Sequence, residues 1–134
     1  MKMRIFILMF LLVSSSQGVF AKGIQQSYKQ CIDATQGVHP SIMNCIDAEA
    51  EFQDQRLNKA YKRLMSILTK SEQKNLLTAQ RQWIALSSTD KSLMLAIYGE
   101  GDAARMIAEE VYLKALAQRA DQLEEWVDAL KLYR

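Results

Sequence analysis

The chain is 134 residues long, about one domain's worth, and carries 17 Lys and Arg against 15 Asp and Glu. Removing Lys2 and Arg4 with an N-terminal leader leaves 15 of each sign, so the pI of 8.5 belongs to the precursor and the remaining chain is close to neutral. A neutral chain has no global field that attracts nucleic acids or membranes, so we expect neither as a partner.

The first residues have the pattern of a secretory signal peptide. Two basic residues precede an uninterrupted apolar run at residues 5–13, and a small residue, Ala21, stands at a plausible cleavage point. The run is too short to cross a bilayer, and no cysteine directly follows it that could carry a lipid anchor. We expect residues 1–21 to be removed and residues 22–134 to form one periplasmic or secreted domain without a membrane anchor.

Both cysteines, Cys31 and Cys45, belong to the part of the chain that would be exported. An oxidising compartment favours a disulfide between them, which would close a loop of 15 residues and stabilise the fold by about 3 kcal/mol in the chain-entropy model. The alternative, a metal site, lacks ligands, because the one histidine, His39, stands beside Pro40 in a turn. We therefore expect no metal and no cofactor.

Apolar residues at steps of three and four predict a short helix at residues 23–35. Gly37 suits a left-handed C-cap, and Ser41, just after Pro40, can cap the next helix. That second helix should span residues 42–68, where apolar residues again follow the spacing of a bundle seam.

Residues 69–72 have the spacing of a capping box, which predicts the start of a third helix over about residues 72–98. Serine and threonine at 87–90 weaken helix propensity, so this helix either bends there or ends and restarts. After a glycine-rich turn with Asp102 as a natural N-cap, a last helix should span residues 103–130. No segment alternates like a strand. The sequence thus predicts an all-α bundle of three long helices plus a short N-terminal helix.

Residues suited to catalysis are scarce. Nucleophilic catalysis needs a Ser, Cys or Thr beside a base, usually a histidine, but His39 lies in a turn and both cysteines should be oxidised. Glu49 and Asp54 could in principle be the paired carboxylates of a glycosidase. Five residues of helix turn by about 500°, however, so these side chains would point about 140° apart. We expect no catalytic residue and no enzymatic activity.

Polar residues recur among the apolar ones of the helix at residues 45–64. They form either a solvated face or a network that joins this helix to the next one. The expected network comprises Glu49, Asp54, Asn58, Tyr61, Gln80, Arg81 and Trp83. We expect Arg81 to pair with Glu49 or Asp54, and the network to fix helix register more than to bind a partner.

Charge is unevenly distributed along the chain. Residues 56–81 hold seven bases and one acid, whereas residues 100–128 hold eight acids and three bases. Either two helices of complementary charge pack side by side, or an acidic surface is offered to a basic partner. The candidate partner-binding surface comprises Glu100, Asp102, Glu109, Glu110, Glu124 and Glu125. The turns at residues 38–41 and 99–102 are further candidates.

Three motifs carry a resemblance to a known family. The first is Cys45-x3-Glu49-x4-Asp54-x2-Leu57-Asn58-x2-Tyr61-x2-Leu64. The second and third are Ala79-Gln80-Arg81-x-Trp83-Ile84 and Arg119-x3-Leu123. Together they resemble the LprI-like lysozyme-inhibitor domain, of the N-terminal domain type, over roughly residues 28–125.

The sequence departs from this family pattern at a second disulfide. Many members carry an Arg-Asp pair and a cysteine after the tryptophan motif, where this chain has Ser87, Ser88 and Lys91. The matching cysteine of the last helix corresponds to Val111. The resemblance therefore implies a single-disulfide version of the bundle, in which the second half of the third helix lacks a usual tether.

The resemblance implies an exported helical domain and, in the named member, an ability to bind and inhibit lysozyme. One hypothesis is therefore a periplasmic or secreted inhibitor of lysozyme-type muramidases that acts by protein–protein binding. The alternative is a periplasmic interaction or envelope-stress module with a different partner and no enzymatic activity. Slowed lysis of peptidoglycan would favour the first hypothesis, and recovery of one stoichiometric partner other than a muramidase would favour the second.

Overall fold

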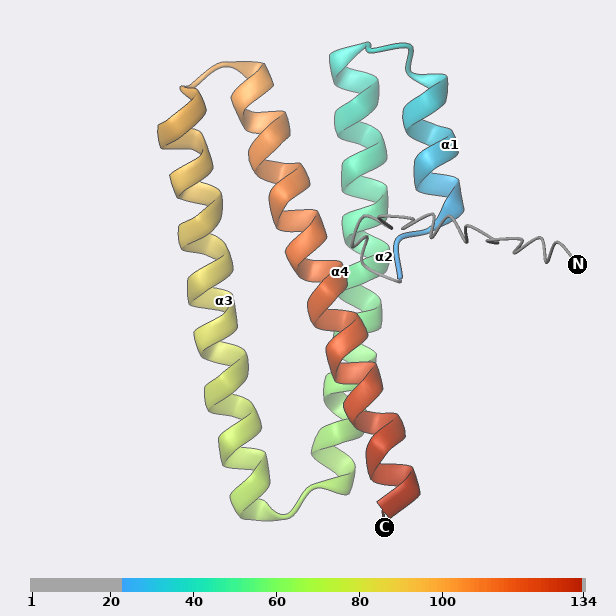
Figure 1. Ribbon diagram of the computed structural model, residues 1–134, viewed down its shortest axis with the longest axis vertical. Helices are drawn as coiled ribbons and strands as arrows, with labels where there is room; N and C mark the ends of the chain where they lie inside the picture. Colours follow the sequence, from blue (N-terminus) through green and yellow to red (C-terminus); the bar gives the residue numbers. More distant parts are fainter. Residues whose placement is uncertain (1–22, 134) are drawn as a thin grey trace, which may run out of the picture.

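Four α-helices form the part of the chain that the structure, a computed structural model, describes: residues 23–133 (Figure 1). They are α1 (Gln26–Ala34), α2 (His39–Ile67), α3 (Lys70–Tyr98) and α4 (Asp102–Tyr133). The predicted all-α bundle of three long helices and one short one is confirmed. The expected signal peptide at residues 1–21 lies outside the described residues.

Helix α4 forms the centre of the bundle. It packs along α2 on one side and against α3 on the other, while α1 packs against α2. Figure 1 shows α2 and α4 running in the same direction, with α3 running in the opposite direction. The α1–α2 and α3–α4 turns therefore lie at one end of the molecule, and the α2–α3 turn lies at the other.

Apolar residues at alternating steps of three and four build the core between α2 and α4. In α2, Leu57, Ala60 and Leu64 are buried. The seam expected in the last helix is buried too, at Leu116, Ala120, Leu123 and Val127. Each buried leucine or valine stabilises the fold by about 1.5–3 kcal/mol relative to an exposed one. The two seams therefore hold α2 and α4 together as the main layer of the bundle.

The helix starts differ from the predicted ones by one to three residues, and two of the differences have a clear physical reason. Helix α2 begins at His39, three residues early, with Val38 as its N-cap. Pro40 fits in this first turn, because a backbone N–H there would have no helical acceptor. Ser41 therefore lies inside the first turn and does not cap the helix. Helix α4 starts at Asp102 itself, whose negative charge in the first turn is favoured by the helix dipole.

Helix α3 begins at the expected capping box and continues to its end without a break. Thr69 N donates to Glu72 Oε2 at 2.8 Å, and Glu72 N donates to Thr69 Oγ1 at 3.4 Å. The helix does not end at residues 87–90. Hydroxyl groups in this segment donate to carbonyls one turn earlier, as Thr89 Oγ1 does to Ala85 O at 2.9 Å, so they remain compatible with the helix.

An ion pair holds the second half of α3 to α4. Lys91 Nζ lies 2.6 Å from Glu109 Oε1 and 5.4 Å from the centroid of the Tyr112 ring. Lys91 occupies the position where the family resemblance would place a cysteine. This segment is thus tethered to α4 by a partly buried charge pair in place of a second disulfide.

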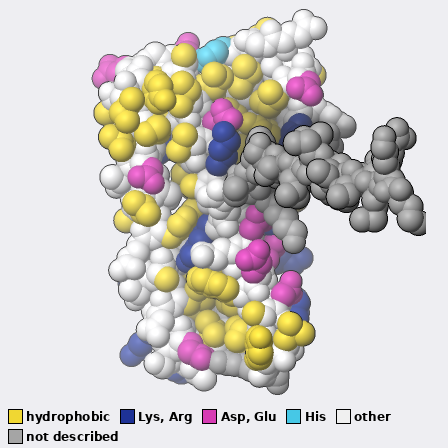
Figure 2. Space-filling model, in the orientation of Figure 1, with side chains coloured by type: hydrophobic (Ala, Val, Ile, Leu, Met, Phe, Trp, Pro, Cys, Tyr) yellow, Lys and Arg dark blue, Asp and Glu magenta, His cyan; other side chains and the backbone are white. Residues whose placement is uncertain are grey.

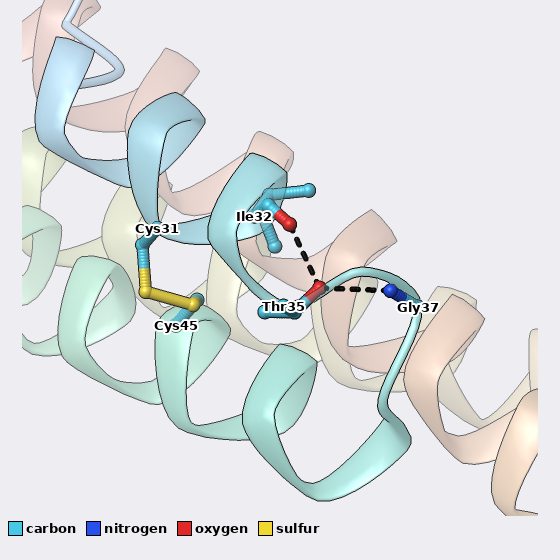
Figure 3. The surroundings of a disulfide bond; sticks show 5 residues. All are labelled: Cys31, Ile32, Thr35, Gly37 and Cys45. Atoms are coloured by element: carbon cyan, nitrogen blue, oxygen red, sulfur yellow. Dashed lines mark hydrogen bonds between the residues drawn. A yellow bond between two sulfur atoms is a disulfide. The ribbon is translucent and has the colours of Figure 1, made fainter.

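The expected disulfide between Cys31 and Cys45 joins α1 to α2, with Cα atoms 5.8 Å apart (Figure 3). Cys45 is buried, whereas Cys31 is exposed. In the turn that follows α1, Gly37 has the expected left-handed backbone, with φ of 82°. Thr35 Oγ1 donates to Ile32 O at 2.7 Å and accepts from Gly37 N at 3.3 Å, as Figure 3 shows. The disulfide and this turn fix α1 against the start of α2.

Candidate functional site

A charged cluster joins α2 to α4 beside the core. Arg56 Nη2 donates to Asp121 Oδ1 at 2.7 Å, and Arg56 Nε donates to Glu124 Oε1 at 3.1 Å. Burial acts to lower the pKa of Arg56, but the hydrogen bonds and negative charges of Glu124 and Asp121 outweigh it and raise the pKa above its usual value. Arg56 therefore stays charged and links the two parallel helices.

The cluster continues through buried polar side chains to the start of the described chain. Gln53, with 0 % of its surface exposed, donates from Nε2 to Glu49 Oε1 and to Gly23 O, both at 2.7 Å. Its Oε1 accepts from Arg56 Nη1 at 2.6 Å. Gln25 N donates to Glu49 Oε1 at 3.0 Å. Each member thus finds partners within the fold, as buried polar groups require.

Gly23 lies so close to this cluster that a side chain there would require Arg56 to shift. Its N–H donates to Asp121 Oδ2 at 3.2 Å, and a Cβ atom at this position would lie 1.6 Å from Arg56 Nη1. The main chain before α1 is therefore held against α2 and α4, because Glu49 and Asp121 accept hydrogen bonds from it and Gln53 donates one to it. The cluster acts as a clamp within the protein.

The structure does not form the expected network as a whole. Arg81 is exposed on α3 and makes no ion pair with Glu49 or Asp54 in the part of the chain that is described. Asp54 is exposed as well and accepts a hydrogen bond from Asn58 Nδ2 at 2.8 Å. The pairing of Arg81 is absent because α3 packs mainly against α4, so this part of α3 does not reach α2. Arg56, on α2 itself, fills the role expected of Arg81.

Two other members of the expected network lie where α3 meets α4. Gln80 is buried and accepts at Oε1 from Arg119 Nε at 3.0 Å. Trp83 is partly buried, as is Tyr61 of α2, and both pack against the core. The seven expected residues therefore divide between the α2–α4 clamp, the α3–α4 contact and the exposed surface.

Arg119 is the buried base of the α3–α4 contact. Only 7 % of its surface is exposed, and burial lowers the pKa of its guanidinium. Its Nη1 donates to Gln122 Oε1, its guanidinium carbon lies 5.3 Å from the centroid of the Trp126 ring, and Nη2 has no partner in residues 23–133. The cation–π contact and two amide acceptors compensate part of the cost of burying this charge.

A cleft of about 350 Å³ opens between α3 and α4 above Arg119. Its walls combine apolar and polar side chains, namely Trp83, Leu86, Ser87, Asp90, Gln118 and Gln122. The buried Arg119 forms part of the wall of this cleft. The cleft lies between α3 and α4, whereas the disulfide-linked α1 packs against α2.

The expected acidic surface is dispersed along α4. Glu109, Glu110 and Glu124 are bound within the protein, to Lys91, Lys114 and Arg56 respectively. The remaining three, Glu100, Asp102 and Glu125, are exposed and form no ion pair in residues 23–133.

Glu125 also lies far from the other two exposed acids. The 23 residues of helix from Asp102 to Glu125 span roughly 35 Å. The structure therefore does not bring the six acids together on one surface, and the clamp uses part of the acidic charge internally. The turn at Gly99, with a positive φ of 92°, carries two of the exposed acids at one end of the bundle.

The sequence analysis assigns no role to Arg56 or Gln53, and it names Arg119 only as part of a family motif. Glu49, Gln53 and Arg56 follow one another at steps of four and three, which is the spacing of one helix face, and this pattern was the available signal. The contact of Arg56 with Asp121 spans 65 residues, however, and no local pattern encodes such a pairing.

Residues 23–133 show no group of three or more His, Cys, Asp or Glu side chains placed to hold a metal ion. None of the helices in the described range is long and apolar enough to cross a membrane. Glu49 is buried in the clamp while Asp54 is exposed, so these two carboxylates do not share a cleft.

Comparison with known proteins gives one match. The family model described as "Lysozyme inhibitor LprI" matches residues 31–123. The chain matches no curated protein and no solved structure. The matched range runs from the disulfide cysteine of α1 to the core residue Leu123 of α4 and so includes the contacts that define the bundle. The chain belongs to the LprI lysozyme inhibitor family.

Proposed function

We propose that this protein is an exported inhibitor of lysozyme-type muramidases that acts by binding the enzyme. The observation that carries this proposal is membership of the LprI lysozyme inhibitor family over residues 31–123. Export is inferred from the basic residues and apolar run at the start of the chain, which have the pattern of a signal peptide. A periplasmic or secreted location would place the protein where muramidases act on peptidoglycan.

The architecture supports a binding role. An inhibitor needs a surface that keeps its shape when the enzyme docks, because ordering a loose surface reduces affinity. Here the disulfide fixes α1, the Arg56 clamp fixes α2 to α4, and Lys91 fixes α3 to α4. Exposed acids at Asp90, Glu100 and Asp102 give one end of the bundle a charge that complements a cationic enzyme.

Turnover of peptidoglycan by this chain has little support from its carboxylates. Glu49 accepts hydrogen bonds from Gln53 and from the main chain of Gln25, so its oxygen is already used within the fold. Asp54 lies on the exposed side of α2. The proposal is therefore inhibition by occupation of the enzyme's surface, without chemistry on the inhibitor.

The test is a lysis assay with purified protein and several lysozymes. Micromolar protein should slow the clearing of a peptidoglycan suspension, and the effect should grow with inhibitor concentration and saturate. A Cys31→Ser/Cys45→Ser variant tests the role of the disulfide without adding a reductant that would damage the lysozyme. Unchanged lysis rates with all lysozymes would contradict the proposal, and recovery of a different stoichiometric partner from a periplasmic extract would favour the alternative interaction module.

A further inference from the structure

Helix α3 carries a row of four exposed residues, three of them apolar and one acidic, that the fold does not cover. Leu86, Asp90, Leu93 and Ile97 follow one another at steps of four, three and four, the spacing of a helix-packing seam. At about 100° per residue, all four fall within an arc of roughly 60° on one side of the helix. Leu86 is 61 %, Leu93 51 % and Ile97 59 % exposed. We call these four residues the α3 stripe.

The α3 stripe is distinct from the side of α3 that packs on α4. The buried residues of α3 are Leu76, Gln80 and Ser87, and they lie about a quarter of a turn away from the stripe. Single exposed leucines are ordinary in soluble proteins, but three large apolar residues exposed along one side of a helix indicate a surface suited to contact with another molecule. Figure 2 shows hydrophobic side chains gathered at the end of the molecule that holds the C-terminal half of α3 and the start of α4.

We propose that the α3 stripe is the surface on which a cationic muramidase docks, an inference that rests on the proposed function. The charges around the stripe are the reason why we expect a cationic partner. Asp90 lies within the stripe, and Glu100 and Asp102 follow it in the adjoining turn; all three are exposed and form no ion pair in residues 23–133. Two bases lie between residues 82 and 106: Lys91, which Glu109 neutralises, and the exposed Arg105 in the first turn of α4. The three exposed acids therefore still outnumber the exposed base of this segment.

The other end of the bundle has the opposite charge, which orients the partner. Exposed bases gather near the α2–α3 turn, at Lys59, Lys62, Arg63, Lys70 and Lys74. A cationic enzyme is repelled from that end and attracted to the end with the α3 stripe. Apolar residues that lie beside charges of a sign complementary to the partner are typical of protein–protein interfaces.

Asp90 argues against a second copy of this chain as the occupant. A symmetric dimer built on the stripe would bury Asp90 of both copies against apolar residues, and an unpaired buried carboxylate is costly. A basic enzyme surface can instead place a Lys or Arg opposite Asp90. Leu86 and Asp90 also line the cleft above Arg119, so a side chain of the partner can enter a hollow directly beside the stripe.

The test measures binding of a cationic C-type lysozyme to purified variants by titration calorimetry. Asp90→Lys should weaken binding by about tenfold or more, since it replaces attraction by repulsion within the interface. Its matched control is Asp47→Lys, which makes the same charge change at an exposed acid of α2 and should bind like wild type. Leu93→Ser should also weaken binding by about tenfold, whereas Ile84→Ser should not.

Ile84 is a close control for Leu93. It is 53 % exposed, and nine residues of helix place it on the opposite side of α3. Helicity and melting temperature of each variant should match wild type, because the four side chains are exposed. If wild-type protein binds lysozyme and the stripe variants bind equally well, the assignment of the α3 stripe as the docking surface is wrong, while the proposed function stands.

Two further outcomes separate the remaining explanations. If wild-type protein shows no lysozyme binding, the proposed function fails and the stripe loses its assigned partner. Light scattering with size-exclusion chromatography should find a monomer. A wild-type dimer that Leu93→Ser converts to a monomer would overturn the assignment and show that a second copy covers the stripe.

Discussion

At the scale of single residues, Arg56 shows how one side chain can organise a bundle. Its guanidinium donates to Gln53 within α2 and to Asp121 and Glu124 in α4. Planar, delocalised and always charged, a guanidinium can satisfy several acceptors at fixed angles. The same group lies where a Cβ atom of residue 23 would be, so a larger residue there would displace the guanidinium from the clamp.

Replacing Arg56 by alanine should destabilise the fold. The change leaves Asp121 and Glu124 without their base and Gln53 Oε1 without its donor, so we expect a loss of about 2–3 kcal/mol in the free energy of unfolding. Urea unfolding followed by circular dichroism measures this. Arg81→Ala is the matched control, and its exposed position should keep its effect within about 0.5 kcal/mol. Equal effects of both variants would contradict the clamp.

Tyr28 should make stability depend on alkaline pH. Burial raises the pKa of the Tyr28 hydroxyl, and the negative charges of Glu110 and Glu49 raise it further. The folded state therefore favours the neutral hydroxyl. The contribution of the neutral Tyr28 hydroxyl to the free energy of unfolding is fully present below the pKa of about 10 in the unfolded state. It is lost as pH rises through the higher pKa of the folded state. Tyr28→Phe should lose less stability than wild type between pH 9 and 11.

Unfolding curves at several pH values test whether Tyr28→Phe loses less stability than wild type as pH rises. Tyr98→Phe serves as the control, because it removes a hydroxyl from an exposed position at the end of α3. It should keep the wild-type dependence on pH. The same alkaline slope in wild type and Tyr28→Phe would show that α1 does not constrain the hydroxyl.

At the scale of elements, α1 depends on its attachments more than the long helices do. It is nine residues long and has no buried residue, and isolated helices of this length are marginal in water. The disulfide and the hydrogen bond from Gln25 to Glu49 hold it in place. The long helices α2 and α4 instead carry their own buried seams.

Removing the disulfide should therefore release α1 first. A Cys31→Ser/Cys45→Ser variant should lose about 3 kcal/mol of stability, as expected for a loop of this size. Hydrogen exchange should show faster exchange in α1 than in wild type, with slow exchange retained in the core segments of α2 and α4. Unchanged protection of α1 would mean that its non-covalent contacts suffice.

The elements that the sequence predicts correctly are those with local signals. The capping box at Thr69, the left-handed Gly37 and the apolar seam of α4 each depend on residues close together in the chain. The start of α2 was placed three residues late, because Pro40 was read as ending a turn when it also fits the first turn of a helix.

The clamp was harder to predict because its partners are distant in sequence. The predicted pairing of Arg81 with Glu49 or Asp54 requires α3 to pack beside α2, as consecutive helices often do. The structure places α4 between them as the common neighbour, which brings Arg56 to Asp121 and leaves Arg81 in solvent. Helix periodicity gives the apolar face of each helix but does not say which helix covers it.

At the scale of the whole molecule, charge is separated along the bundle axis. The exposed bases near the α2–α3 turn and the exposed acids near the α3–α4 turn lie at opposite ends. The chain as a whole is nearly neutral, so this separation gives a dipole more than a net field. A partner approaching such a molecule is oriented before it makes contact.

Lysozyme binding should accordingly weaken as salt increases. Screening shortens the reach of exposed charges to about 8 Å at physiological ionic strength and to about 3 Å at 1 M. The association rate should fall more than the dissociation rate rises, because steering acts during approach. Surface plasmon resonance at several salt concentrations measures both rates. Binding that is insensitive to salt would indicate an interface governed by apolar contacts alone.

The parallel pairing of α2 and α4 has a consequence for how the chain acquires its structure. Two helices that run in the same direction need a connection that returns along their whole length, and here α3 supplies it. The apolar seam of α2 therefore stays uncovered until α4, the last helix of the chain, has been made. A nascent or truncated chain that lacks α4 exposes Leu57 and Leu64 and invites aggregation or chaperone binding. Burial of the α2 seam therefore depends on the C-terminal helix.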